Sequence, residues 1–401
     1  MWIGRNRSAF RHRVNLVSHP SLFPSLFRVR THVLAVLTCL GPLLLGCAGG
    51  GGDSPGLPEA AERRGGASRT VAVAESGADA ELTHVTAMDA DSRGRVYVAD
   101  MLQRSVLVLS PDGQVLHRIG RRGAGPGEFM RIRDVQVLPA DSLLVYDPDL
   151  ARISVFAPDS AVPAYVVNLA ERLPGAPPFH LWRAPATGAY LAHFQARFAF
   201  GPNNELEPRR DSLVLLGPDG APRTVLASFT AAPFLVTRTS VTPHPFGRRA
   251  VARLDSRGRI LFTWTDSLAV AVFSPVGARA GGFSVRYQAP GVTSADAREA
   301  LDAMGEQAKP MFERVLGDSL PPRWPAVGDL RVDERDRIWI SLAGASDQPV
   351  EWAVFSPTGR YLRSVFLPPR TTLHAIRAGR AYAEQVDSSA VPKVVVFEVR
   401  P

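Results

Sequence analysis

The sequence predicts an all-β chain folded as a six-bladed β-propeller of four-stranded blades, and three observations lead to that fold class. From residue 69 to residue 401, short β-rich runs alternate with turns that contain Gly and Pro. One two-part unit recurs throughout that range. The last copy stops after its third strand while a spare strand precedes the first copy, so an N-terminal strand can close the ring.

Each unit starts with a turn that leads into a strand and continues with a strand that runs into a Pro-Asp-Gly type turn. The first part occurs as DSRGRVYVAD (91–100), ADSLLVYD (140–147), ATGAYLAHF (186–194), DSRGRILFTW (255–264), DERDRIWIS (333–341) and RAGRAYAE (377–384). The second part occurs as VLVLSPDG (106–113), ISVFAPDS (153–160), LVLLGPDG (213–220), VAVFSPVG (270–277), WAVFSPTG (352–359) and VVVFEV (394–399). Units of roughly 55 residues give each blade four short strands with loops.

A single four-stranded sheet of this length has too little core to stand alone. Radial stacking of such sheets buries both faces and leaves few exposed edges. We expect the spare strand RTVAVAES (69–76) to complete the sixth blade as its outer strand. Residues 69–401 are therefore assigned to one propeller, which we expect to be monomeric.

Three features resemble the NHL-repeat family of six-bladed propellers. They are the strand GRVYVAD, the turn VLSPDG and the connector IGRRGAGPGEF (119–129). The resemblance is strong for residues 82–159 and continues by pattern through the other blades. It implies the fold and leaves the function open, because one scaffold serves many functions. The glycine-rich connector lacks the Lys-Ser/Thr of a phosphate loop and carries Glu128, so we interpret it as a link between blades.

The chain begins with a segment typical of secretion. Residues 1–46 contain six arginines and no acidic residue, and the apolar run 33–45 is too short to span a bilayer comfortably. The run ends in Leu-Leu-Gly-Cys, which resembles the lipobox of bacterial lipoproteins. This resemblance implies that residues 1–46 are a signal peptide, cleaved after Gly46, and that Cys47 is lipidated. A membrane-anchoring helix with an incidental cysteine is the alternative.

The Gly/Pro/Ala-rich residues 47–68 are predicted to be a flexible tether. We expect a bacterial envelope protein that is lipid-anchored on the extracytoplasmic side. Ala48 after the lipidated cysteine does not signal retention in an inner membrane, so an outer membrane is expected where the cell has one. Cys39 would be lost with the signal, which leaves no cysteine pair for a disulfide in the mature chain.

The net charge of +8 is concentrated at the N-terminus. Without the six arginines of residues 1–46, 40 basic residues face 38 acidic ones, a net charge of +2. The predicted mature protein therefore has no electrostatic footprint for DNA or RNA.

Long insertions are predicted on one face of the propeller, at residues 194–211, 232–248 and 287–326. The last contains a predicted helix near 293–316, capped by Thr293 with Asp296 three residues later, and Pro310 should break or kink it. Such a face can bind a ligand or partner. Equally, the insertions can cover apolar surface.

Aligning the inner strands reveals one column of polar residues at the expected channel mouth. The column consists of His84, Asp134, His180, Ala250, Asp329 and His374. Imidazoles and carboxylates on one axis are suitable ligands for zinc, calcium or another divalent cation. The peptidyl-α-hydroxyglycine α-amidating lyases, also six-bladed propellers, place zinc-binding histidines at a similar point, although here the histidines fall on blades one, three and six. The alternative is a polar ring that bonds ordered water in the channel.

Other polar and aromatic residues are assigned to structure. Asp100 and Asp147 end their strands before turns that carry Arg104 and Arg152, and their recurrence favours side-chain to backbone bonds over catalysis. Four tryptophans could stack on a sugar, but tryptophan in a strand more often packs in the core. These are Trp264, Trp324, Trp339 and Trp352.

The sequence thus predicts a lipid-anchored binding module with no certain cofactor, whose ligand is an envelope protein, a peptide or a glycan. The alternative is a metal-dependent lyase or lactonase-type hydrolase that acts through His84, His180 and His374. No Ser-His-Asp spacing or HExxH helix stands out.

Overall fold

The structure is a computed structural model. It describes residues 54–60, 62–63, 66–67, 69–75, 82–199, 206–237, 241–304, 309–387 and 391–399. The predicted signal peptide and Cys47 lie outside the described residues.

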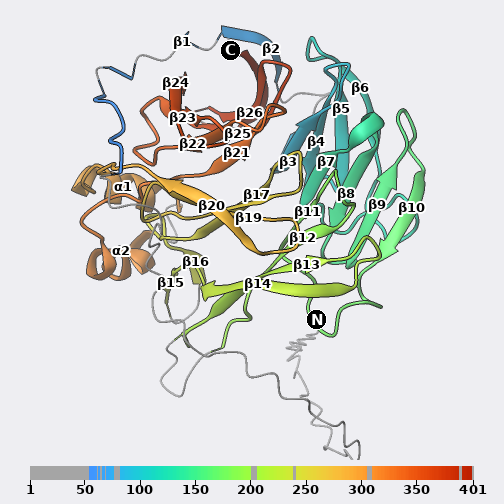
Figure 1. Ribbon diagram of the computed structural model, residues 1–401, viewed down its shortest axis with the longest axis horizontal. Coiled ribbons are helices and arrows are strands. Elements are labelled where there is room, and N and C mark those ends of the chain that lie inside the picture. The colour runs from blue at the N-terminus through green and yellow to red at the C-terminus, as the bar shows by residue number, and fades with distance from the viewer. Residues whose placement is uncertain are drawn as a thin grey trace, which may run out of the picture. The chain divides into compact units, whose positions relative to one another are not determined.

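The described chain forms six blades of four antiparallel strands each, which confirms the six-bladed β-propeller (Figure 1). Blades one and two are β3 (Val85–Ala90), β4 (Val96–Asp100), β5 (Ser105–Leu109) and β6 (Val115–Ile119), then β7 (Asp134–Val137), β8 (Leu143–Asp147), β9 (Arg152–Phe156) and β10 (Pro163–Asn168). Blades three and four are β11 (His180–Arg183), β12 (Tyr190–Phe194), β13 (Arg210–Leu216) and β14 (Pro222–Thr230), then β17 (Ala250–Leu254), β18 (Ile260–Trp264), β19 (Ala269–Phe273) and β20 (Arg279–Ser284). Blade five is β21 (Leu330–Val332), β22 (Ile338–Ser341), β23 (Val350–Phe355) and β24 (Tyr361–Leu367).

The sixth blade is built from both ends of the propeller and closes the ring. It combines β25 (Thr371–Arg377), β26 (Arg380–Val386) and β27 (Pro392–Glu398) with β2 (Arg69–Glu75). The β2 strand pairs antiparallel with β27, Val73 opposite Val395, and lies beside the C-terminal strands in Figure 1. The predicted closure by an N-terminal strand is therefore confirmed. The inner strands β3, β7, β11, β17, β21 and β25 each contact the next around the ring, and β25 contacts β3.

Each junction between neighbouring blades has its own apolar cluster, because the middle strands are covered on both faces. Val108 and Val145 meet between blades one and two, and Tyr146 packs with Tyr190 between blades two and three. Trp339 and Trp352 are buried between blades five and six. The prediction that these tryptophans belong to the core is confirmed.

Two of the predicted insertions pack on each other. The hairpin of β15 (Phe234–Val236) and β16 (Val241–Pro243) shares a small core with α1 (Ser294–Asp302) and α2 (Lys309–Ser319). That core contains Leu235, Phe246, Leu301, Phe312 and Leu316. Thr293 and Asp296 form the predicted capping box of α1, and Pro310 lies in the first turn of α2. These insertions therefore bury apolar side chains of their own against one another.

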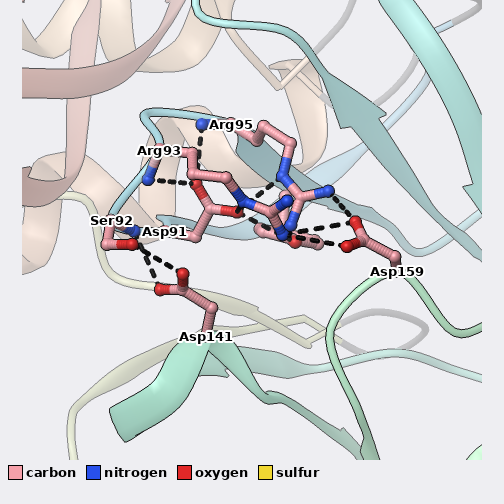
Figure 2. Close-up of polar contacts among 7 residues, drawn as sticks. Asp91, Ser92, Arg93, Arg95, Asp141 and Asp159 are labelled. Carbon is pink, nitrogen blue, oxygen red and sulfur yellow. Dashed lines mark hydrogen bonds and ion pairs between the residues drawn. The ribbon is translucent and has the colours of Figure 1, made fainter.

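The recurring DSRGR turn joins neighbouring blades (Figure 2). In blade one, Asp91 accepts bonds from the backbone N–H groups of Arg93 and Arg95 and pairs with the Arg95 side chain at 2.6 Å. Arg93 and Arg95 then both reach Asp159 of blade two, and the Ser92 hydroxyl donates to Asp141 of blade two. Ser256 of blade four bonds Asp336 of blade five in the same way. The motif is thus a structural device of the turn and the junction.

Asp100 and Asp147 fix turns, as the sequence predicts. Asp100 accepts bonds from the backbone N–H groups of Thr83, Leu102 and Gln103, and Asp147 accepts from those of Met130, Arg131 and Asp149. The neighbouring arginines bond carbonyl groups instead of these carboxylates: Arg104 donates to Met130 and Arg152 to Ala124. These residues are not arranged for catalysis.

The described part of residues 54–67, here called the strap, lies on blades four and five, although the sequence predicted a flexible tether over residues 47–68. Leu57 N–H donates to the Arg286 carbonyl, and Arg286 N–H donates to the Pro55 carbonyl. The short strand β1 (Gly66–Ala67) pairs parallel with β24. Arg63 forms a two-pronged ion pair with Glu351, with N–O distances of 2.7 and 3.2 Å. A compositional argument misses such partners because they are remote in sequence.

We expect the substitution Arg63→Ala to detach the strap without unfolding the propeller. The Arg63 and Glu351 side chains are only 11% and 14% exposed, so removal of one partner leaves a buried charge. Amide hydrogen exchange at Leu57 should accelerate by at least about tenfold. The control is Arg69→Ala, which removes an exposed pair with Glu398. Equal exchange at Leu57 in both variants would contradict the clamp.

Candidate functional site at the channel

The six inner strands surround a cavity of about 190 Å³. Every inner strand contributes a polar side chain to its wall. These side chains are Thr86, Asp89, Asp134, Gln136, His180, Trp182, Arg253, Arg331, His374 and Arg377. The cavity is the place where residues from all six blades converge.

The structure separates the five residues that the sequence proposed as metal ligands. Asp134, His180 and His374 line the cavity, whereas His84 is exposed outside it and Asp329 lies beside the guanidinium groups of the wall. Among the described residues, no group of three or more His, Cys, Asp or Glu side chains is arranged to hold a metal ion. The predicted zinc or calcium ring is therefore not assembled in this geometry.

Asp134 and His180 form a pair across blades two and three. The carboxylate Oδ1 lies 2.8 Å from His180 Nδ1, and Oδ2 accepts the N–H of Leu181 at 3.0 Å. Burial lowers the pKa of His180, so the imidazole is neutral at pH 7 and its Nδ1–H donates to Asp134. The other ring nitrogen, Nε2, faces Arg133 Nη2 at 3.5 Å. This orientation leaves Nε2 as an acceptor.

The Trp182 ring joins this pair to the next blade. His180 stacks on Trp182 with a centroid distance of 5.4 Å and an interplanar angle of 16°. The Arg253 guanidinium lies 5.2 Å from the centroid of the same ring. The contacts with His180 and Arg253 hold Trp182 in place, and they occupy ring surface that a sugar would otherwise use.

Arg253 and Arg331 share the carboxylate of Asp329. Arg253 Nη2 lies 3.0 Å from Oδ1 and Arg331 Nη1 lies 2.6 Å from Oδ2. Burial raises the pKa of Asp329, but the charges of Arg331, Arg253 and Arg249 outweigh it and hold that pKa well below the usual range. Burial and the charge of Arg331 lower the pKa of Arg253 to about 10. Asp329 and Arg253 are therefore both charged at pH 7.

Side chains around the channel bridge all six blade junctions. The bridges are Asp89 to the N–H of Val137, Asp134 to His180, Arg253 to Trp182, Arg253 to Asp329, Arg331 to the carbonyl of Leu373, and Arg377 to Asp89. The polar ring thus stabilises the closed propeller.

Sequence reasoning missed several of these residues. Gln136, Trp182 and Arg331 lie two positions after Asp134, His180 and Asp329, so the period-two alternation of a strand could have identified them. Arg253 lies three positions after Ala250, and Arg377 lies three positions after His374. The pairing of β25 shifts in register between Leu373 and Ala375, which moves Arg377 to the channel side.

The fold and the family comparison define the same class of protein, a six-bladed β-propeller. Residues 80–168 match a family described as a 6-bladed beta-propeller. No curated protein has a matching sequence.

Several solved structures are similar to this chain in fold. One is a member of the duf4221 family from Bacteroides vulgatus, with 8% identity, coverage of 83% of this chain and 98% of that chain, and a TM-score of 0.49. Another is a gluconolactonase from Xanthomonas campestris, with 15% identity, 86% and 95% coverage, and a TM-score of 0.48. A third is regucalcin, a calcium-binding protein from Agrobacterium tumefaciens, with 10% identity, 80% and 92% coverage, and a TM-score of 0.41. At these identities the likeness concerns the fold alone.

Within the parts of the chain that the structure describes, no helix has the length and apolar character needed to cross a membrane.

Proposed function

We propose that this protein is a lipid-anchored binding module on the extracytoplasmic side of a bacterial envelope, and that it holds a peptide or glycan in the channel cavity. The supporting observation is the convergence of polar side chains from all six inner strands on one cavity. Because these side chains also bond to one another across the junctions, they are fixed before a ligand arrives. Such preorganisation lowers the entropic cost of binding. The peptide or glycan held in the cavity could be part of another envelope protein.

The anchor is tested by the substitution Cys47→Ser. We expect this variant to lose incorporation of a radiolabelled palmitate in a bacterial host and to leave the membrane fraction. The physical reason is that two or more acyl chains are needed for stable anchoring, and the thiol carries the diacyl group. Cys39→Ser is the matched control, because Cys39 lies inside the predicted signal and should leave labelling unchanged. Undiminished labelling of Cys47→Ser would refute the lipobox assignment.

The binding role is tested with full-length protein in detergent, screened against cell-wall glycan fragments and short peptides. A ligand should raise the melting temperature by mass action. Oxidative footprinting then locates it: a ligand in the cavity should protect Trp182, while Trp324, which packs against Phe246 in the insertion core, should react as before. Protection confined to the insertions would place binding on that face and refute the channel site.

A second candidate function, a lactonase-type hydrolase or lyase, is favoured by the Asp134–His180 pair. A neutral imidazole held by a carboxylate at 2.8 Å can act as a general base through Nε2. A metal-dependent form would also need ligands that this geometry keeps apart. Lactone turnover that falls at least about a hundredfold in His180→Ala would establish the enzyme. Elemental mass spectrometry of protein purified without a histidine tag would show whether zinc or calcium takes part.

A further inference from the structure

The cavity wall carries an uneven set of charges. Its cationic groups are Arg253, Arg331 and Arg377, and its carboxylates are Asp89 and Asp134. Asp89 is bound by Arg377, and Asp134 is bound by His180. Burial lowers the pKa of both wall histidines, His180 and His374, which keeps them neutral at pH 7. The two carboxylates of the wall are thus already paired with other side chains. Neither of them is paired with Arg253 or Arg331, which lie on adjacent inner strands.

Arg253 and Arg331 are held in fixed positions by their other bonds. Arg253 donates from Nη1 to the carbonyl of Ala252 at 2.8 Å, and Arg331 donates from Nε to the carbonyl of Leu373 at 3.0 Å. Each also reaches Asp329 with one terminal nitrogen. These bonds leave the Nε–H of Arg253 and the Nη2 group of Arg331 as donors. Two anchored guanidinium groups on adjacent inner strands suit a planar, doubly accepting anion.

The size of the cavity restricts what can enter. Its volume of about 190 Å³ lies below the roughly 300–1,000 Å³ of sites for drug-sized ligands. A single group of monosaccharide or amino-acid size fits, whereas a longer chain would have to remain outside. Arg377 on the blade-six side is already paired with Asp89, so the favourable position for an anion lies between blades four and five.

We propose that the channel takes a carboxylate group of its ligand between Arg253 and Arg331, with Asp329 as an internal carboxylate that shares the same two guanidinium groups. This inference rests on the proposed binding function and specifies its ligand class. Asp329 neutralises part of the charge that attracts the ligand. The geometry therefore yields an unusual expectation: removal of the Asp329 carboxylate should tighten the binding of a carboxylate ligand.

The test compares glucuronate, glucose and an acetylated dipeptide with a free C-terminus, each titrated by calorimetry into full-length protein. In wild type we expect glucuronate or the dipeptide to bind at least tenfold more tightly than glucose, and more weakly at 500 mM than at 50 mM NaCl. Binding by glucuronate alone identifies an acidic sugar as the source of the carboxylate. Binding by the dipeptide alone identifies a peptide terminus.

Variants then test the roles of the residues. Asp329→Asn keeps the shape and removes the charge, and should tighten carboxylate binding about tenfold. Arg331→Gln should weaken it at least tenfold, and Arg331→Lys should give a smaller loss, because lysine keeps the charge without the planar fork. Arg223→Gln, which alters an exposed pair with Asp219, is the matched control. Circular dichroism checks that each variant is folded.

Two results would overturn the proposal. The first is carboxylate binding that is unchanged or weaker in folded Asp329→Asn. The second is binding of neither acid to wild type or to Asp329→Asn. In both cases, protection of Trp182 by a neutral glycan or peptide would still support the channel as a binding site. If no glycan or peptide protects Trp182 from oxidation, the proposed function itself is refuted.

Discussion

Substitution of Arg377 by alanine should lower the free energy of unfolding by about 3 kcal/mol, because Arg377 closes the ring beside the first blade. Its Nε and Nη2 atoms each lie 3.1 Å from the carboxylate of Asp89 on β3. Asp89 is only 5% exposed and also accepts the N–H groups of Ala90 and Val137. The arginine is 37% exposed, so the expected loss lies at the lower end for a broken buried pair.

Urea denaturation followed by tryptophan fluorescence measures this effect. The matched control is Arg223→Ala, because Arg223 and Asp219 are 59% and 49% exposed and such pairs contribute at most about 1 kcal/mol. If both arginine variants shift the midpoint equally, the Asp89–Arg377 pair does not contribute specially to closure. The Coulombic attraction of Asp89 raises the pKa of Arg377, so this arginine stays charged across the neutral range.

Removal of β2 should have the largest effect on the fold. A chain that begins at Leu82 lacks the strand that pairs with β27, so β27 becomes an open edge with unpaired N–H and C=O groups. The apolar cluster between blades one and six also loses Ala74. We expect this chain to aggregate and to lack a cooperative thermal transition.

The comparison chain begins at Arg69 and keeps β2, but it lacks the strap and the residues that precede it. It should elute as a single species in size-exclusion chromatography and retain its β-type circular dichroism. A well-folded, monodisperse chain that starts at Leu82 would show that three strands suffice in the sixth blade. Failure of both chains would instead assign an essential role to the strap.

The propeller could be predicted because its repeating signal is local. Each blade is recognised by a turn, an apolar strand and a second turn. These patterns can be read without knowing which distant residues pack together. Blade six lacks a fourth strand and a spare strand lies at 69–76, so the spare strand is predicted to complete blade six. The same local logic identified Thr293 as a cap and assigned Asp100 and Asp147 to turns.

The candidate site was predictable only in part. The alignment of the inner strands placed Asp134, His180 and His374 correctly at the cavity, but it also included His84, which lies outside it. Register irregularities in β3 and β25 break the alignment that a simple column assumes. Arg377 escaped notice because its place on the channel side depends on such a shift, whereas β17, which carries Arg253, pairs without one.

The number of blades, the order of their strands and the closure of the ring follow from the sequence alone, because they depend on short-range patterns that repeat. The partners of the polar side chains are known only from the folded chain: Asp134 with His180, Asp329 with two arginines, and Arg63 with Glu351. Apart from Asp329 and Arg331, which lie two positions apart, these partners come from different blades or from opposite ends of the chain. Their energies depend on distance and burial, which adjacency in sequence does not encode.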